Sequence, residues 1–190
     1  SIVIEAKYIL EIVRKIDADE IEFEMIDGSL TKISGNTAEF RINGMRANEY
    51  PAIDFSKPKE CFALKEETLK KVILQTNFAT SDKETRPVLT GVNFHCEGNT
   101  LHCVATDSYR LAKKTIDISE SLNFNITIPA KSLSEVVKTL EGEGEVEIAV
   151  NDKKAQFIIH DTIVQTRLID GVYPETSRLI PLQLDFELTI

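Results

Sequence analysis

The sequence contains no tryptophan, 2 methionines and 3 cysteines in 190 residues. The cysteines have no Cys-x-x-Cys spacing, and their odd number argues against a disulfide framework. A reducing, cytoplasmic setting is therefore expected. No run approaches the ~18 to 20 apolar residues of a membrane span. Residues 1–10 also lack the charged-then-apolar order of a signal peptide, so the sequence argues against a membrane or secreted protein.

Basic side chains are scarcer than acidic ones, because 22 Lys and Arg stand against 31 Asp and Glu for a net charge of −9. Such a charge favours solubility and opposes non-specific binding to nucleic acid. The 42% of hydrophobic residues suffice to fill a core. Strand-like alternation begins abruptly at Ile2, as though the chain were cut from a longer one.

Two segments of the chain repeat each other at an offset of 124 residues. Residues 6–16 and 130–140 both place apolar side chains at helical spacing. The matched pairs are Ile9 with Leu133, Ile12 with Val136, Val13 with Val137 and Ile16 with Leu140. Each helix precedes two strands joined by a tight turn, at 27–28 and 151–152, and then a Tyr-Pro pair. This shared order predicts an internal duplication.

A unit of similar plan lies between the two copies. Residues 65–76 have a helical pattern, and the strand-like segments 88–96 and 101–106 flank a tight turn at 98–99. We expect an α+β fold built from repeated strand–helix–strands units. The predicted domains are the second half of one domain (1–55), a complete domain (56–181) and the first strand of a third (182–190).

Catalytic and metal-binding patterns are weak. Pairing around the turn at 98–99 places His95 beside His102 on one face, with two cysteines on the other. Two histidines fall short of a four-ligand zinc site, so we interpret them as solvent-side imidazoles over buried thiols. The sequence has no Gly-x-Ser-x-Gly elbow and no glycine-rich phosphate loop. We expect no enzyme, metal or cofactor; catalysis would need these histidines to meet Asp107 and Ser108 in a cleft.

Basic side chains gather on the predicted helices. Residues 7–16, 65–76 and 131–140 carry +2, +1 and +1, so the rest of the chain carries −13. Exposed helices often carry lysines as solvated surface, so the pattern leaves a nucleic-acid role open. If the helices share one side, that side contacts phosphates without reading bases. The candidate DNA-facing residues are Lys7, Arg14, Lys70, Lys71, Lys83, Lys131 and Lys138.

Three further segments are rich in proline, leucine, arginine and aromatic side chains where loops are ordinarily polar. They are ETRPVLTG (84–91), TDSYRLA (106–112) and YPETSRLIP (173–181). Arginine and tyrosine beside small apolar groups are typical of protein-docking hot spots. The residues alone leave docking and ordinary inter-domain packing equally open.

Taken together, TRPVLTGVNF (85–94), ATDSYRLA (105–112) and IDGVYPETSRLIP (169–181) resemble the bacterial DNA polymerase III β subunit family, the replicative sliding clamps. The resemblance covers essentially the whole chain. It implies a DNA-clamp fold, with helices on one side and antiparallel sheets on the other, and a head-to-tail homodimer ring around duplex DNA. It also implies a non-catalytic processivity factor of the bacterial cytoplasm, associated with the nucleoid. Its partners would be duplex DNA, bound without sequence preference, and the polymerase catalytic subunit, clamp loader and repair proteins, bound through short peptides.

The resemblance further implies a groove for those peptides. Its residues here are Arg86, Leu89, Thr106, Ser108, Tyr109, Arg110, Leu111, Pro174, Arg178 and Leu179. The leucines and the proline can form an apolar cup, with two arginines at its rim for peptide carbonyls or carboxylates. Tyr109 stands where the family more often has histidine, so the aromatic surface is kept without its pH dependence.

Relative to the family, the front half of the first domain and most of the third are missing. We therefore expect an incomplete groove and no ring-type dimer from this chain. The alternative left by the residues is an α+β scaffold module without a nucleic-acid role, in which the helical lysines are solvated surface.

Overall fold

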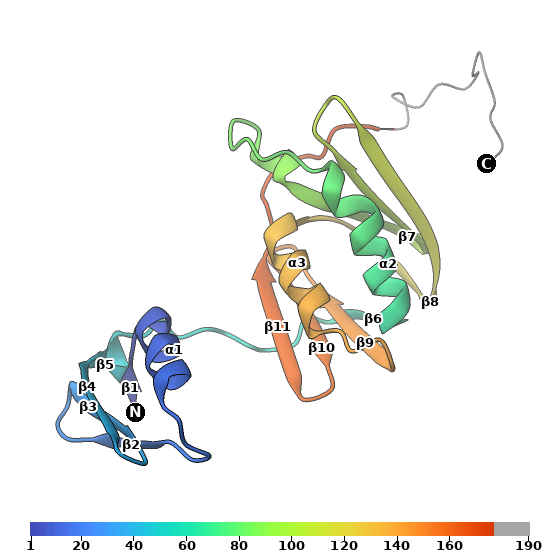
Figure 1. The fold of residues 1–190 in the computed structure, drawn as a ribbon. Helices are drawn as coiled ribbons and strands as arrows, with labels where there is room; N and C mark the ends of the chain where they lie inside the picture. The colour runs from blue at the N-terminus through green and yellow to red at the C-terminus, as the bar shows by residue number, and fades with distance from the viewer. Residues whose placement is uncertain (177–190) are drawn as a thin grey trace. The chain divides into compact units, whose positions relative to one another are not determined.

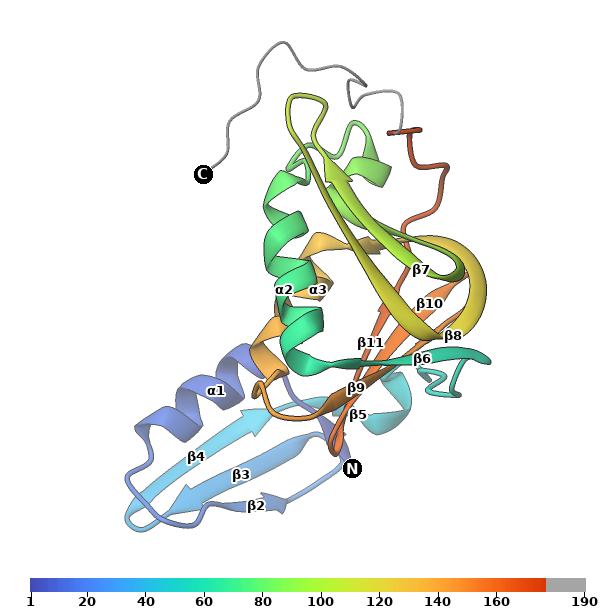
Figure 2. The same cartoon turned by 90° about the vertical axis from the view of Figure 1, so that its right-hand side faces the viewer.

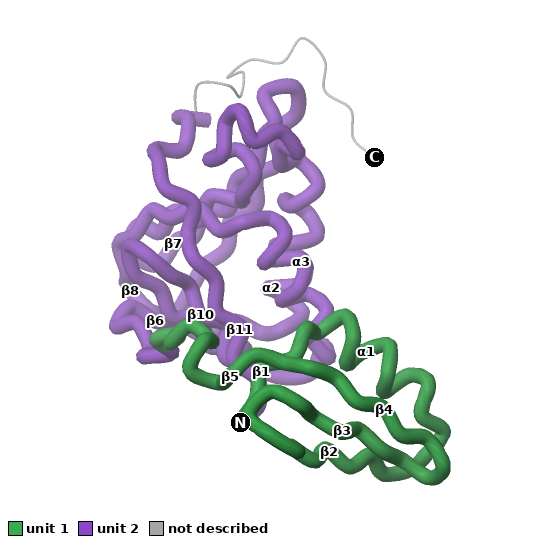
Figure 3. The backbone as a smooth tube through the Cα atoms, turned by 90° about the vertical axis from the view of Figure 1, so that its left-hand side faces the viewer, with its two compact units in different colours: residues 1–54 green, residues 55–190 purple. Residues whose placement is uncertain are grey.

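The computed structural model describes residues 1–176, which form two compact units. The first unit comprises residues 1–54 and the second begins at Phe55 (Figure 3). The predicted strand at 182–190 and the predicted groove residues Arg178 and Leu179 lie outside the described residues. Within the described residues, the structure contains no helix that is both long enough and apolar enough to cross a membrane.

The first unit is one helix with short antiparallel strands (Figure 1). Its elements are β1 (Ile2–Val3), α1 (Ala6–Lys15), β2 (Glu22–Met25), β3 (Leu30–Gly35), β4 (Ala38–Asn43), β5 (Met45–Arg46) and a 3₁₀ turn η1 (Ala47–Glu49). Strands β2, β3 and β4 form a sheet in that order, and β1 pairs with β5. Oδ1 of Asp27 accepts hydrogen bonds from the backbone N–H groups of Ser29 and Leu30, each at 2.8 Å, which fixes the turn between β2 and β3.

The second unit has two helices and two antiparallel sheets. Its elements are β6 (Glu60–Lys65), α2 (Glu66–Thr76), η2 (Asn77–Ala79), η3 (Pro87–Thr90), β7 (Gly91–Thr106), β8 (Leu111–Pro129), α3 (Ala130–Thr139), β9 (Glu145–Val150), β10 (Lys154–Ile159) and β11 (Thr162–Arg167). One sheet has the order β11-β10-β9-β6, and the other consists of β7 and β8. The α+β prediction is confirmed. The strand predicted from residue 88 begins only at Gly91, because Pro87–Thr90 form the 3₁₀ turn.

Strand β7 reverses direction at its centre. The imidazole centroids of His95 and His102 are 6.4 Å apart, whereas seven residues of extended strand would separate them by about 23 Å. Gly98 has a φ of 63°, which accommodates the reversal predicted at 98–99. Strand β8 pairs with both arms of β7, from Thr106 opposite Leu111 to Gly91 opposite Pro129, and so curves around the hairpin (Figure 2).

The core of the second unit lies between its helices and its sheets. Helices α2 and α3 lie side by side on one side of the strands (Figures 1 and 2). The side-chain amide of Asn77 joins them by donating to the Ala130 carbonyl at 3.1 Å and the Ser134 hydroxyl at 3.0 Å. The predicted inward positions of α2 are buried: Leu69, Val72, Ile73 and Thr76. Stacked rings of Phe62 and Phe124, 5.9 Å apart, connect β6 to β8.

The structure repeats its elements at the predicted offset. Helix α3 lies 124 residues after α1, β10 after β3 and β11 after β4, and the two hairpins have the same register. Asn36 and His160, at corresponding tight turns, have left-handed φ values of 48° and 50°. Strand β9 is displaced by one residue relative to β2, because Glu22 pairs with Ser34 whereas Glu147 pairs with Ile158. The extra residue falls in the loop after α3, where Gly142 and Gly144 have positive φ values.

Candidate functional site

Parts of the three predicted segments meet at a small apolar cluster in the second unit. Leu89 from η3, Val104 from β7 and Tyr173 are buried together, and Val88 and Leu111 pack against them. The Tyr173 hydroxyl accepts a hydrogen bond of 3.0 Å from the backbone N–H of Thr106, which ties the chain after β11 to the end of β7. Burial raises the pKa of the Tyr173 phenol. The predicted groove residues within residues 86–111 therefore share one region with Tyr173 and the adjoining Pro174.

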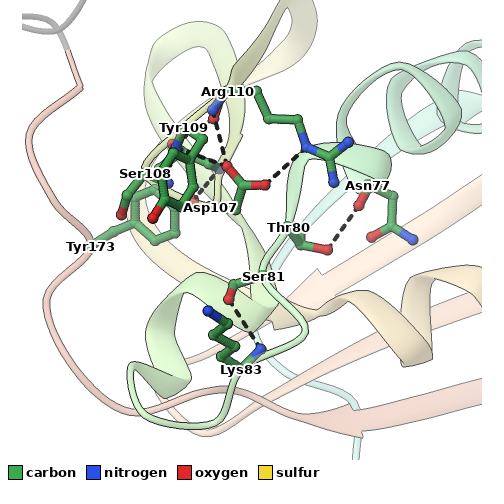
Figure 4. Close-up of polar contacts among 10 residues, drawn as sticks. Asn77, Thr80, Ser81, Lys83, Asp107, Ser108, Tyr109, Arg110 and Tyr173 are labelled. Carbon is green, nitrogen blue, oxygen red and sulfur yellow. Dashed lines mark hydrogen bonds and ion pairs between the residues drawn. The ribbon is translucent and has the colours of Figure 1, made fainter.

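The tight turn between β7 and β8 is held by its own side chains (Figure 4). The Thr106 hydroxyl accepts a hydrogen bond from the Ser108 N–H at 3.1 Å and donates to the Arg110 carbonyl at 2.7 Å. Oδ1 of Asp107 accepts from the backbone N–H groups of Tyr109 and Arg110, each at 2.9 Å. Ser108 has a φ of 79°, a left-handed conformation that is costly for a residue with a side chain. The turn is thus a defined structure in which several bonds hold a strained residue.

Two arginines border this turn. Nε of Arg110 lies 2.9 Å from Oδ2 of Asp107, and its guanidinium carbon lies 5.9 Å from the centre of the Phe78 ring. The pKa of Asp107 is lowered, first by hydrogen bonds from the backbone N–H groups of Arg110 and Tyr109 and then by the Arg110 charge. Nη1 of Arg86 donates to the Ser108 hydroxyl at 3.2 Å, which connects the 84–91 segment to the turn.

The exposure of these side chains divides the site into a floor and a surface. Leu89 is 2% exposed, so it supports the site from beneath, whereas the sequence interpretation placed it on the wall of an open cup. Leu111 and Pro174 are half-buried and can offer apolar surface. Tyr109 is 95% exposed and stands free of the cluster. A ligand at this site would meet aromatic, apolar and guanidinium groups together, a combination suited to protein or peptide recognition.

Sequence reasoning missed several residues that shape the site. Val104 and Tyr173 form the buried floor, Phe78 lies against the Arg110 guanidinium, and Asp107 binds that guanidinium directly. Asp107 stood inside the recognised motif, and Tyr173 belonged to the repeated Tyr-Pro pair, so both were visible in the sequence. Phe78 carried no such signal, because it is a single aromatic residue beyond the end of a predicted helix.

The predicted DNA-facing residues occupy both units. Lys70 and Lys71 lie on α2, Lys131 and Lys138 on α3, Lys83 in the loop before η3, and Lys7 and Arg14 on α1. Within the second unit, the neighbouring helices α2 and α3 therefore carry four of these lysines. Two are already ion-paired on their own helices: Lys71 with Glu67 at 2.6 Å and Lys138 with Glu135 at 2.7 Å.

The histidine pair in β7 lies opposite two buried cysteines, as the pairing around the turn at 98–99 predicted. His95 lies 3.2 Å from Glu97, and Nδ1 of His102 lies 3.0 Å from the Thr115 hydroxyl. Cys96 and Cys103 are fully buried on the opposite face, and burial raises the pKa of both thiols. Asp107 follows β7 and lies five residues after His102, which corresponds to about 16 Å along an extended chain. This separation disfavours a catalytic cleft shared by His102 and Asp107. Residues 1–176 contain no group of three or more His, Cys, Asp or Glu side chains arranged to hold a metal ion.

Comparison with known proteins places both units in one family. Residues 63–175 match the central domain of the DNA polymerase III beta subunit, and residues 1–54 match its N-terminal domain. The beta sliding clamp of Bacillus subtilis is 40% identical over 193 residues, covering 100% of this chain and 51% of that protein. The beta sliding clamp of Halalkalibacterium halodurans is 41% identical over 186 residues, covering 95% and 49%.

The fold agrees with the sequence match. A crystal structure of the Bacillus subtilis DNA polymerase sliding clamp superposes with a TM-score of 0.89 at 38% identity, covering 96% of this chain and 49% of that one. The chain therefore spans about half the length of the relatives it matches.

Proposed function

The chain belongs to the DNA polymerase III β subunit family, and we propose that it acts as part of a sliding clamp, a processivity factor that tethers DNA polymerase to duplex DNA. The observation that carries the proposal is the site at the β7–β8 turn, where exposed Tyr109 and two guanidinium groups border a small apolar cluster. The chain spans about half the length of the relatives it matches. In this proposal, the ring-shaped homodimer also needs the half of the family's sequence that this chain does not cover. The role is non-catalytic and belongs in the bacterial cytoplasm at the nucleoid.

The proposed partners bind through short peptides. Leu111 and Pro174 offer half-buried apolar surface to a leucine or phenylalanine anchor of the peptide. The terminal nitrogens of Arg110 can donate to peptide carbonyl groups, since its Nε is already bonded to Asp107. Such a site takes different proteins that share an anchor, which suits the polymerase catalytic subunit, the clamp loader and repair proteins.

Duplex DNA is the proposed partner of the helix side. Lys70, Lys71, Lys131 and Lys138 belong to the neighbouring helices α2 and α3. The glutamate pairs of Lys71 and Lys138 are exposed, and exposed pairs contribute little to stability, so phosphates can compete for these lysines. Contacts of this kind bind phosphate without reading base sequence, and they weaken as salt rises.

Titration of a fluorescently labelled short peptide with leucine and phenylalanine anchors tests the peptide site. Burying one anchor contributes roughly 1.5 to 3 kcal/mol, so two anchors together with a hydrogen bond from a guanidinium contribute about 4 to 7 kcal/mol. We therefore expect weak binding, with a Kd of ~10 to 1000 μM. Arg178→Ala should weaken binding by about 1.5 to 3 kcal/mol if its guanidinium bonds to a peptide carbonyl, and Leu111→Ala should weaken it by removing apolar surface. Equal affinity for the wild type and both variants would exclude this site as the peptide groove.

A further inference from the structure

Asp107 makes more contacts than its turn requires. Its Oδ1 accepts the backbone N–H groups of Tyr109 and Arg110, and its Oδ2 lies 2.9 Å from Nε of Arg110. One carboxylate thus fixes both the backbone of the turn and the direction of a side chain that leaves it. The Asp107 side chain is 20% exposed, whereas that of Arg110 is 56% exposed, so the carboxylate lies deeper than the guanidinium it holds.

Two other turns of the chain show what the backbone alone requires. Oδ1 of Asp27 accepts the N–H groups two and three residues ahead at 2.8 Å, and Oδ1 of Asn151 does so at 2.9 and 2.8 Å. Asn151 shows that a neutral amide satisfies such a turn, because only one side-chain oxygen is used. The negative charge and second oxygen of Asp107 are therefore directed to Arg110.

We infer that Asp107 is a positioning residue, which orients the Arg110 guanidinium for a partner's carbonyl groups; the role in binding rests on the proposed function. Asp107 engages Nε, and the Phe78 ring lies 5.9 Å from the guanidinium carbon. Neither terminal nitrogen bonds to another of residues 1–176, so both can donate outward. An arginine held in this way has fewer rotamers to lose when a peptide binds.

The test compares Asp107→Asn with Asn151→Ala in the complete 190-residue chain. Asp107→Asn keeps an oxygen acceptor for the turn but removes the ion pair. Releasing one ordered side chain should raise the Kd for the labelled leucine–phenylalanine peptide about two- to tenfold. Asn151→Ala removes a turn-capping side chain of the same unit away from the site, so it should leave this Kd unchanged. A general effect of turn loss would instead weaken binding in both variants.

A double-mutant cycle separates positioning from other effects. If Asp107 acts through Arg110, then Asp107→Asn should cause no further loss of binding in an Arg110→Ala background. An undiminished loss in that background contradicts the inference, as does a Kd for Asp107→Asn equal to that of the wild type.

A second measurement does not depend on binding. The ¹⁵N relaxation of the Arg110 Nε–H group should report an ordered side chain in the wild type and a mobile one in Asp107→Asn. Equal order in the two proteins contradicts positioning even if the wild type binds peptide. A wild type that binds no peptide contradicts the proposed function, and the binding role of Asp107 falls with it, whatever the relaxation shows.

Discussion

Residues 6–43 and residues 130–167 contain the same helix and strands, yet they bury different amounts of apolar surface. Leu133 and Val136 of α3 are fully buried, whereas α1 has no buried residue. The β9 residue Ile148 is fully buried, and Phe23, which corresponds to it after the one-residue shift, is 50% exposed. In the second unit the repeat packs against another strand–helix–strands motif, β6 to β8, and the described residues of the first unit contain no such motif.

The comparison shows that one sequence pattern can form the same helix and strands in both units while its apolar side chains are buried to different extents. Both copies form the same hairpins in the same register, so local propensity and alternation suffice for the elements. Packing between motifs supplies most of the stability of such elements. In this chain as it stands, the first unit should therefore open more readily than the second, which hydrogen exchange can measure unit by unit.

The largest expected effect comes from truncating matched helix positions. Leu133→Ala should destabilise the second unit by about 2 to 5 kcal/mol, because the side chain is fully buried. Ile9→Ala, its counterpart 124 residues earlier, should cost clearly less because Ile9 is only half-buried. Hydrogen exchange of peptides from each unit, measured across a urea series, resolves the two effects. Equal losses at both positions would mean that the first unit is packed as well as the second.

A smaller effect should follow from a contact that only α2 makes. The Glu66 side chain is fully buried, accepts the Gly142 N–H at 2.7 Å and lies 2.9 Å from Nε2 of His160. Alanine stands at the corresponding first position of both α1 and α3, at residues 6 and 130. Glu66→Ala leaves the Gly142 donor without its partner, which should cost about 1 to 3 kcal/mol in the second unit.

Glu66→Gln is the matched control, because the amide oxygen can still accept from Gly142 while the charge opposite His160 is lost. We expect a smaller loss than for alanine, measured by the same exchange experiment. If the two variants are equally destabilised, the stabilising contact is the one with His160.

Much of this architecture could be predicted from the sequence because the repeated patterns are local. The offset of 124 residues gave the helices and hairpins, and alternation around Gly98 gave the reversal of β7. The site was predicted less completely. The motifs located the β7–β8 turn by resemblance, but local patterns cannot show that Leu89 is buried in one cluster with Tyr173 or that Phe78 lies beside Arg110. These contacts join residues far apart in the chain, and only the tertiary fold brings them together.

The smallest expected effect concerns acid, and it compares Asp27 of the first unit with Asp107 of the second. Hydrogen bonds from backbone N–H groups lower the pKa of both carboxyl groups below the ordinary value of 3.8. A carboxylate with a lowered folded pKa stabilises the fold above its unfolded pKa, and that contribution is lost as pH falls through the folded pKa. NMR titration of the carboxyl carbons should therefore find both midpoints below 3.8, and a midpoint at or above it would contradict the turn geometry.

Two variants assign the acid effect to each unit. Asp27→Asn should make the acid-induced loss of hydrogen-exchange protection shallower in the first unit alone, and Asp107→Asn should do so in the second unit alone. Because both carboxyl groups of the wild type stay ionised well below neutral pH, its peptide binding should not vary through them between about pH 6 and 8.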